Sequence, residues 1–158
     1  MRILFVCTGN VFRSVSAELL CRGYLEKQGM AGIQVSSAGT SAMPQPFLPV
    51  VLHTLSKYGI HVHGHKQTRL TEDHFKSFDV VVAMAESHVR FIKEHFSRDV
   101  PLFNEIVYGT KTSVQDVNEA IPDWMLHPIK CYEHVEKTIA HLHDAMPVFM
   151  ENVGKFMK

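Results

Sequence analysis

The chain begins with a short apolar run, residues 2–7 (RILFVC), which leads through a Thr-Gly-Asn turn into a helical pattern that begins at Ser14. An unbroken apolar run of this length, bounded by turn residues, is typical of a strand buried on both faces of a parallel sheet. Parallel neighbours need crossover connections, which are right-handed and usually contain a helix. The opening stretch therefore predicts an α/β fold with helices on both faces of a parallel sheet.

The rest of the sequence continues this alternation. The predicted strands cover residues 2–7, 32–36, 79–83 and 100–103, and the predicted helices cover residues 14–28, 47–58 and 87–96. Residues 104–128 are polar and weakly periodic, which predicts a long functional loop with one short helix. An apolar stripe at helical spacing follows to Phe156, and Pro147 within it predicts a kink or a restart. We expect one domain over residues 1–158, built on an open four-stranded, Rossmann-like parallel sheet.

Composition excludes several classes of function. Sixteen Lys plus Arg balance sixteen Asp plus Glu without a basic block, so we expect no nucleic-acid partner. The sequence has neither a bilayer-spanning apolar stretch nor a signal-peptide pattern, so we expect a soluble cytoplasmic protein without membrane insertion. The cysteines, Cys7, Cys21 and Cys131, form neither an even disulfide set nor a C-x-x-C pair. This usage fits a reducing compartment in which thiols stay free.

Cys7 ends the first predicted strand, which is where ligands bind in open parallel sheets. The following residues can turn their backbone N–H groups inward as an anion-binding nest at the start of a helix. These residues are Thr8, Gly9, Asn10, Val11 and Phe12. Arg13 adds a planar fork that matches two phosphate oxygens. Such surroundings favour a nucleophilic thiolate, and Ser14 can hydrogen-bond the sulfur and help it leave in a second step.

Other interpretations of this loop are weaker. A cysteine at the end of a strand is commonly a small core residue, but the joint C-x5-R-S spacing at a strand-to-helix junction favours a nucleophile. A Walker-type loop would need a following G-K-S/T, and a dinucleotide fingerprint would need further glycines. The sequence contains neither pattern, so the loop predicts an oxyanion site with a sulfur at its base.

The loop resembles the signature of the low-molecular-weight protein tyrosine phosphatases, approximately V-C-x-G-N-x-C-R-S-P. Residues 6–15 read VCTGNVFRSV. Weaker matches follow in the family's order at residues 36–40 (SSAGT), 59–65 (GIHVHGH), 78–84 (FDVVVAM) and 121–123 (IPD). The resemblance covers nearly the whole chain and implies the family's fold, called phosphotyrosine phosphatase I-like.

The family's reaction is the hydrolysis of phosphotyrosine or another aryl phosphate through a phosphocysteine intermediate, without a metal or other cofactor. The resemblance implies a phosphorylated protein or a small aryl phosphate as substrate, and phosphate or other oxyanions as inhibitors. By matching position it implies Cys7 as nucleophile, Arg13 as phosphate clamp and Ser14 as the hydroxyl that assists the thiolate. Asp123 corresponds to the general acid and base.

Three further residues, Asn10, Ser37 and His65, correspond to a polar network that holds the family's loop in shape. Phe12 departs from the signature because it replaces a second cysteine, so a disulfide between that position and the nucleophile is impossible. Val15 replaces a proline, which removes a preset backbone angle but no reactive group.

The acid loop departs further from the family pattern. Asp123 is followed by Trp124, Met125 and Leu126, where the family has a proline and then an aromatic residue. Met43 stands where many members have an aromatic wall. We expect Met43, Trp124 and Met125 to form the pocket wall and to alter substrate preference.

Four alternatives remain open. Protein arginine phosphatases share the loop, and thioredoxin-coupled arsenate reductase uses a similar loop with two further cysteines. A non-catalytic phosphopeptide or anion-binding module would need only the nest, not a nucleophile or an acid. His61, His63 and His65 alternate and would lie on one side of an extended segment, where they could bind zinc. If these histidines bind no metal, we expect His65 to hydrogen-bond to the Cys7 loop.

Overall fold

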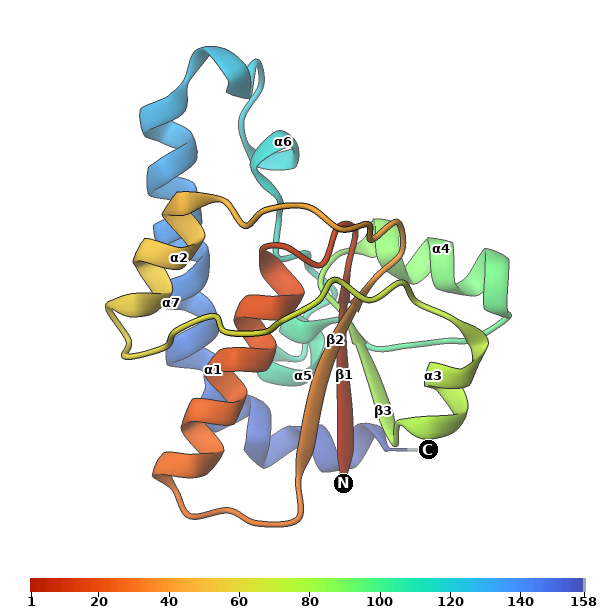
Figure 1. Cartoon of the computed structure of the whole chain (residues 1–158). Coiled ribbons are helices and arrows are strands. Elements are labelled where there is room, and N and C mark those ends of the chain that lie inside the picture. The colour runs from red at the N-terminus through yellow and green to blue at the C-terminus, as the bar shows by residue number, and fades with distance from the viewer. Residues whose placement is uncertain (158) are drawn as a thin grey trace.

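The computed structural model describes residues 1–157 and contains one parallel sheet (Figure 1). β1 (Arg2–Cys7) lies in the centre, between β2 (Gln34–Gly39) and β3 (Val80–Ala83). The parallel register places Cys7 beside Gly39 at the carboxyl end of the sheet. The predicted α/β class is confirmed, and residue 158 of the predicted domain lies outside the described residues.

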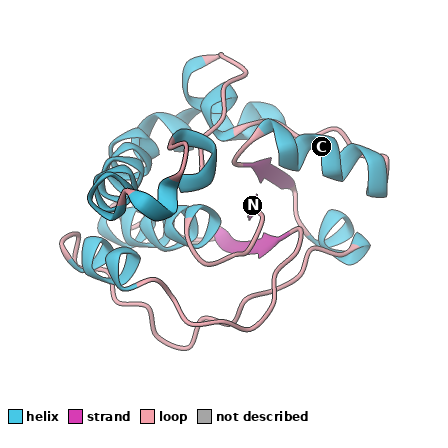
Figure 2. Cartoon of the chain, turned by 90° about the horizontal axis from the view of Figure 1, so that it is seen from above, coloured by secondary structure: helices cyan, strands magenta, loops and turns pink. Residues whose placement is uncertain are grey.

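Helices cover both faces of this sheet, as predicted (Figure 2). The face covered by the longest helices carries α1 (Arg13–Lys27), α2 (Pro49–Ser56), α5 (Phe103–Tyr108) and α7 (Pro128–Asn152). The opposite face carries α3 (Glu72–Ser77) and α4 (Glu86–Phe96). The remaining helical segments are α6 (Val117–Ala120) and the 3₁₀ turns η1 (Trp124–Leu126) and η2 (Val153–Phe156).

The core follows from the alternation of side chains along β1. Ile3 and Phe5 point into the cluster under α1 and α7, whereas Leu4 and Val6 point into the cluster under α3 and α4. Phe5 packs on Phe149 of α7 with their ring centroids 5.2 Å apart. Burial on both faces explains why the run lacks the polar alternation of a half-exposed strand.

The predicted fourth strand at residues 100–103 is wrong, since the sheet has three strands. Leu102 makes only an isolated bridge to Ala83. Pro101 has no N–H for a ladder, and its carbonyl accepts the Ala83 N–H at 2.9 Å. The Leu102 N–H bonds to the Glu105 carboxylate at 3.2 Å, which caps α5. A fourth strand cannot form here, because Pro101 has no N–H group and the Leu102 N–H caps α5.

The segment after β3 is more helical than predicted. Residues 104–128, expected to hold one short helix, contain most of α5, all of α6 and η1. α7 continues to Asn152 with Pro147 inside it. Figure 1 shows the C-terminal part of α7 turned away from the direction of the rest, in agreement with the predicted kink.

Candidate active site

Cys7 is buried at the end of β1, and its Sγ lies 3.0 Å from the Ser14 Oγ. The intervening loop, residues 8–12, bends between the strand and α1. The carbonyls of Cys7 and Thr8 accept the N–H groups of Thr40 and Ser41, both at 2.9 Å. None of the N–H groups of residues 8–12 donates a hydrogen bond to another described residue. These amides are therefore available to an anion.

Asn10 holds the loop from inside. Its φ of 55° lies in the left-handed region, which asparagine tolerates better than most residues. Its Nδ2 donates to the Oγ atoms of Ser14 at 3.0 Å and Ser37 at 2.7 Å. Its Oδ1 accepts the Thr68 N–H at 3.0 Å and contacts His65 Nε2 at 3.2 Å. The structure thus brings Asn10, Ser37 and His65 together, and every hydrogen-bonding position of the asparagine amide is used.

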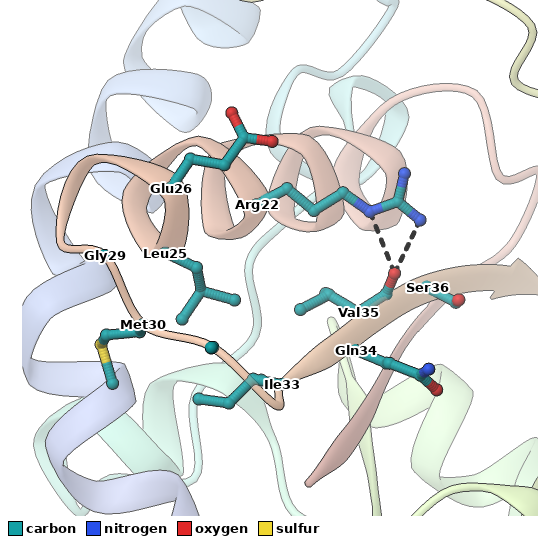
Figure 3. Close-up of a pocket in the computed structure, with 10 residues that line it drawn as sticks. Arg22, Leu25, Glu26, Gly29, Met30, Ile33, Gln34, Val35 and Ser36 are labelled. Carbon is teal, nitrogen blue, oxygen red and sulfur yellow. Dashed lines mark hydrogen bonds between the residues drawn. The ribbon is translucent and has the colours of Figure 1, made fainter.

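Glu18 extends this network, and sequence analysis missed it. Its buried carboxylate accepts the Ser37 hydroxyl at 2.5 Å and pairs with Arg22 at 2.7 Å. Arg22 also donates to the Val35 carbonyl from Nε at 3.1 Å and from Nη2 at 2.8 Å (Figure 3). Burial lowers the pKa of His65, although the nearby Glu18 charge opposes this effect. The spacing of Glu18 four residues after Ser14, on the buried stripe of α1, was the available signal.

His88 of α4 is a second residue that sequence analysis missed. It is buried, and its Nε2 lies 2.9 Å from the Thr8 Oγ1. Its Nδ1 accepts the Ala85 N–H at 3.0 Å, so the neutral ring carries its proton on Nε2 and donates it to Thr8. Burial, aided by the positive charge of Arg13, lowers the pKa of His88 to about 3. A neutral imidazole therefore supports the loop at neutral pH.

Arg13 is 1% exposed, and its guanidinium is held by the segment before α6 and by α6 itself. Nη2 donates to Asp116 Oδ2 at 2.7 Å, and Nη1 donates to Glu119 Oε2 at 3.3 Å and to the Val114 carbonyl at 3.1 Å. A guanidinium has five N–H groups, so two remain, one on Nη2 and the buried Nε–H, which lacks a partner. Two unpaired N–H groups suit two phosphate oxygens.

The side chains expected as acid and pocket wall are exposed, and none of them hydrogen-bonds to the Cys7 loop. The Asp123 side chain is exposed and makes no hydrogen bond or ion pair with another described residue. Trp124, Met125 and Met43 are 45%, 76% and 62% exposed. In Figure 1 the chain after α6 continues away from the sheet to the far end of α7, and this stretch includes η1.

No hydrogen bond joins Cys21, Cys131, His61 or His63 to the Cys7 loop. Cys21 is buried against Met150, 3.7 Å between their sulfurs, and burial raises its pKa to about 12. Cys131 donates to the Trp124 carbonyl at 3.2 Å. His61 and His63 have ring centroids 6.0 Å apart.

The described residues, 1–157, contain no group of three or more His, Cys, Asp or Glu side chains arranged to hold a metal ion. None of their helices combines the length and the hydropathy of a membrane span.

Comparisons with known proteins agree with this site. A protein-arginine-phosphatase of Bacillus subtilis is 36% identical over 120 residues, which are 73% of this chain and 79% of that protein. One from Geobacillus stearothermophilus is 31% identical over 92% of this chain and 93% of its own length. A low molecular weight phosphotyrosine protein phosphatase of Schizosaccharomyces pombe is 37% identical over 58% of this chain and 61% of its own length.

Solved structures resemble the whole fold. A mutant of the YwlE arginine phosphatase with a phosphorylated active-site serine superposes with a TM-score of 0.82, at 28% identity, over 98% of this chain and 97% of that one. The profile of the family described as low molecular weight phosphotyrosine protein phosphatase matches residues 2–156. This chain therefore belongs to that family of cysteine-dependent phosphatases, as the resemblance of its Cys7 loop implied.

Proposed function

We propose that this protein hydrolyses phosphotyrosine and related aryl phosphates through a phosphocysteine formed on Cys7. The observation that carries the proposal is the placement of the Cys7 sulfur, 3.0 Å from the Ser14 hydroxyl, below a loop whose N–H groups have no partner among residues 1–157. Two free N–H groups of Arg13 add a second anchor for phosphate. Phosphate and other oxyanions should occupy the same cradle and inhibit the enzyme.

The first chemical step is attack of the Cys7 thiolate on phosphorus, in line with the departing oxygen. The loop N–H groups and Arg13 stabilise the negative charge on the three equatorial oxygens, so the step needs no metal. Ser14 accepts a hydrogen bond from Asn10, which leaves its own proton for the Cys7 sulfur or the Ala38 carbonyl. Donation to the sulfur stabilises it as a leaving group when water hydrolyses the intermediate.

A second candidate substrate is phosphoarginine. It is favoured by the two relatives named protein-arginine-phosphatases, which are 36% and 31% identical to this chain. The mutant relative with a phosphorylated active-site serine supports transfer of phosphate to the enzyme in either reaction. The exposed side chains of Met43 and Trp124 do not decide between the two substrates. A reducing cytoplasm would keep Cys7 free in both cases.

Hydrolysis of phosphotyrosine, phosphoarginine and phosphoserine peptides, measured side by side, tests the proposal. We expect the highest kcat/KM on phosphotyrosine, and a higher value on phosphoarginine would select the second candidate. Cys7→Ser should abolish turnover while phosphate and vanadate still bind, because the substitution removes the nucleophile and leaves the loop N–H groups. Retained turnover in Cys7→Ser would exclude the phosphocysteine route.

A further inference from the structure

We infer that the Thr8 hydroxyl, positioned by His88, donates a hydrogen bond to an oxygen of the bound phosphoryl group. The inference rests on the proposed function and adds two side chains to its oxyanion site. In that site Thr8 contributes its backbone N–H, and its hydroxyl is a second donor from the same residue. His88 is a positioning residue that reaches the loop from the first turn of α4, 80 residues further along the chain.

The direction of the hydrogen bond between these side chains follows from the His88 ring. Its Nδ1 accepts the Ala85 N–H at 3.0 Å, so the neutral imidazole carries its proton on Nε2. Nε2 lies 2.9 Å from the Thr8 Oγ1, which therefore accepts this bond. A hydroxyl can accept one hydrogen bond and donate another, so the Thr8 proton is not used by His88. This proton has no acceptor among residues 1–157.

The start of α4 holds the His88 ring beside the loop. The Met84 N–H donates to the Val6 carbonyl at 2.9 Å, so the chain leaves β3 next to the end of β1. The His88 N–H donates to the Ala85 carbonyl at 3.0 Å, which closes the first turn of α4. His88 is also 2% exposed, so packing restricts its ring. An anchored ring fixes the Thr8 oxygen and limits the directions in which the Thr8 proton can point.

The Thr8 hydroxyl is close to the place where an anion would bind. Thr8 directly follows the buried Cys7 and is itself exposed. Its backbone N–H has no partner among the described residues and is part of the anion-binding loop. Covalent geometry keeps a threonine hydroxyl oxygen within about 4 Å of its own backbone nitrogen. An oxygen bound by the Thr8 N–H can therefore also be reached by the hydroxyl, and ionised phosphate oxygens are strong acceptors.

A purely structural role for this pair makes a different prediction. In that case the Thr8 hydroxyl only satisfies the buried His88 N–H, which would be costly to leave unpaired. Loss of the hydroxyl would then affect phosphate only indirectly, through the unpaired N–H and a shift of the loop. Removal of both side chains together would abolish this disturbance. If the hydroxyl itself binds phosphate, the loss persists whether or not His88 is present.

Binding of inorganic phosphate, measured by isothermal titration calorimetry on the whole protein, tests the proposal without turnover. Thr8→Val keeps the branched shape and removes the hydroxyl, so we expect the dissociation constant of phosphate to rise about tenfold or more. Thr8→Ser keeps the hydroxyl and should stay within a few-fold of wild type. Thr110→Val removes an exposed hydroxyl from the loop after α5 and is the matched control. In turnover, Thr8→Val should raise the KM for 4-nitrophenyl phosphate and change kcat little.

The double variant Thr8→Val with His88→Leu separates a direct contact from a structural role. It should bind phosphate no better than Thr8→Val, and restored affinity would overturn the proposal, as would wild-type affinity in Thr8→Val. His88→Leu alone should weaken phosphate binding by a few-fold, because the Thr8 hydroxyl loses its anchor, and wild-type affinity there would exclude His88 as the positioning residue.

If the His88 variants do not fold, the titrations of Thr8→Val and Thr8→Ser still decide for or against the phosphate contact. A wild-type protein that binds phosphate but hydrolyses no aryl phosphate would refute the proposed function. The same titrations would then still decide whether the Thr8 hydroxyl binds phosphate.

Discussion

Gly39 is the position where one added methyl group should disturb the oxyanion loop most directly. A Cβ at this residue would lie 2.4 Å from the Thr8 carbonyl oxygen, 3.0 Å from the Asn10 nitrogen and 2.9 Å from the Ala42 Cβ. Ordinary van der Waals contact begins at 3.4 Å, so the new Cβ and the Thr8 carbonyl oxygen, 2.4 Å apart, would have to separate by about 1 Å. Two of the three atoms belong to the backbone of the loop and cannot rotate away.

The cost of Gly39→Ala follows from this overlap. Overpacking of this kind destabilises a folded protein by about 1–3 kcal/mol. The backbone of Cys7 and Thr8 is also tied to the residues just after β2 by the bonds from Thr40 and Ser41, so a shift of this backbone must strain those bonds. A misplacement of about 1 Å in a catalytic group can lower the rate about 100-fold. A loss of about 100-fold in rate corresponds to about 2.7 kcal/mol, so we expect effects of similar size on catalysis and on folding.

Three measurements on Gly39→Ala separate these effects: kcat/KM on 4-nitrophenyl phosphate, the inhibition constant of phosphate, and urea unfolding. Gly154→Ala is the matched control, because a Cβ there meets no atom within 4 Å. We expect kcat/KM to fall about 100-fold and phosphate to bind more weakly, with an unfolding free energy lower by about 1–3 kcal/mol. If Gly39→Ala kept wild-type activity and phosphate affinity, the conclusion that the close approach of β2 holds this loop in place would be refuted.

Burial of neutral His88 should make the stability of the protein sensitive to acid. The pKa of His88 is about 3 in the folded protein, against an ordinary value of 6.5. As the pH falls, the imidazole of the unfolded chain is therefore protonated first, which favours unfolding. The contribution of neutral His88 to the free energy of unfolding should be fully present above pH 6.5. Below pH 6.5 the free energy of unfolding should fall by about 1.4 kcal/mol per pH unit toward pH 3. Urea unfolding at pH 7 and pH 5 should show a smaller fall in His88→Asn, and equal falls would contradict a buried neutral ring. Asn10→Ala removes an amide with four hydrogen-bonding contacts, so we expect a loss of about 2–4 kcal/mol and weaker inhibition by phosphate; unchanged inhibition would show that the network does not hold the loop. Ser14→Ala should slow hydrolysis of the intermediate, seen as a burst of phenol followed by a lower steady rate, and an unchanged steady rate would exclude its assistance to the sulfur. Chelators should leave activity unchanged, and a chelator-sensitive activity would revive the zinc hypothesis.

The placement of Cys7 and its loop could be predicted because these residues are contiguous. Cys7 through Ser14 span one strand end, one turn and one helix start, and each is governed by local backbone geometry. Asn10, Ser37 and His65 were predicted through the family resemblance. Glu18 and His88 were missed because a charged residue in a helix, or a lone histidine, is solvent-exposed in most proteins. Their burial depends on what packs over them.

The sheet shows the same division between local and distant causes. The central strand β1 and the edge strand β3 were predicted from unbroken apolar runs, which need no knowledge of their neighbours. Residues 100–103 have a strand-like composition, but the capping bond from Leu102 to Glu105 and the absence of an N–H at Pro101 end the ladder after one bridge. The Leu102 N–H can either cap a helix or extend the sheet, and the positions of the neighbouring elements in the folded protein decide between the two.

By itself, the sequence determined that Cys7 lies where a buried strand ends and a short loop leads into a helix. That information is local, since hydrophobic periodicity and loop spacing act within about ten residues. Only the tertiary structure decided which carboxylates reach the arginine. Arg13 pairs with Asp116 and Glu119, which are 103 and 106 residues away, whereas Asp123 lies in an outer turn. Charge partners at that separation are chosen by how the chain packs, because coulombic and hydrogen-bond contacts depend on distance in space and not along the sequence.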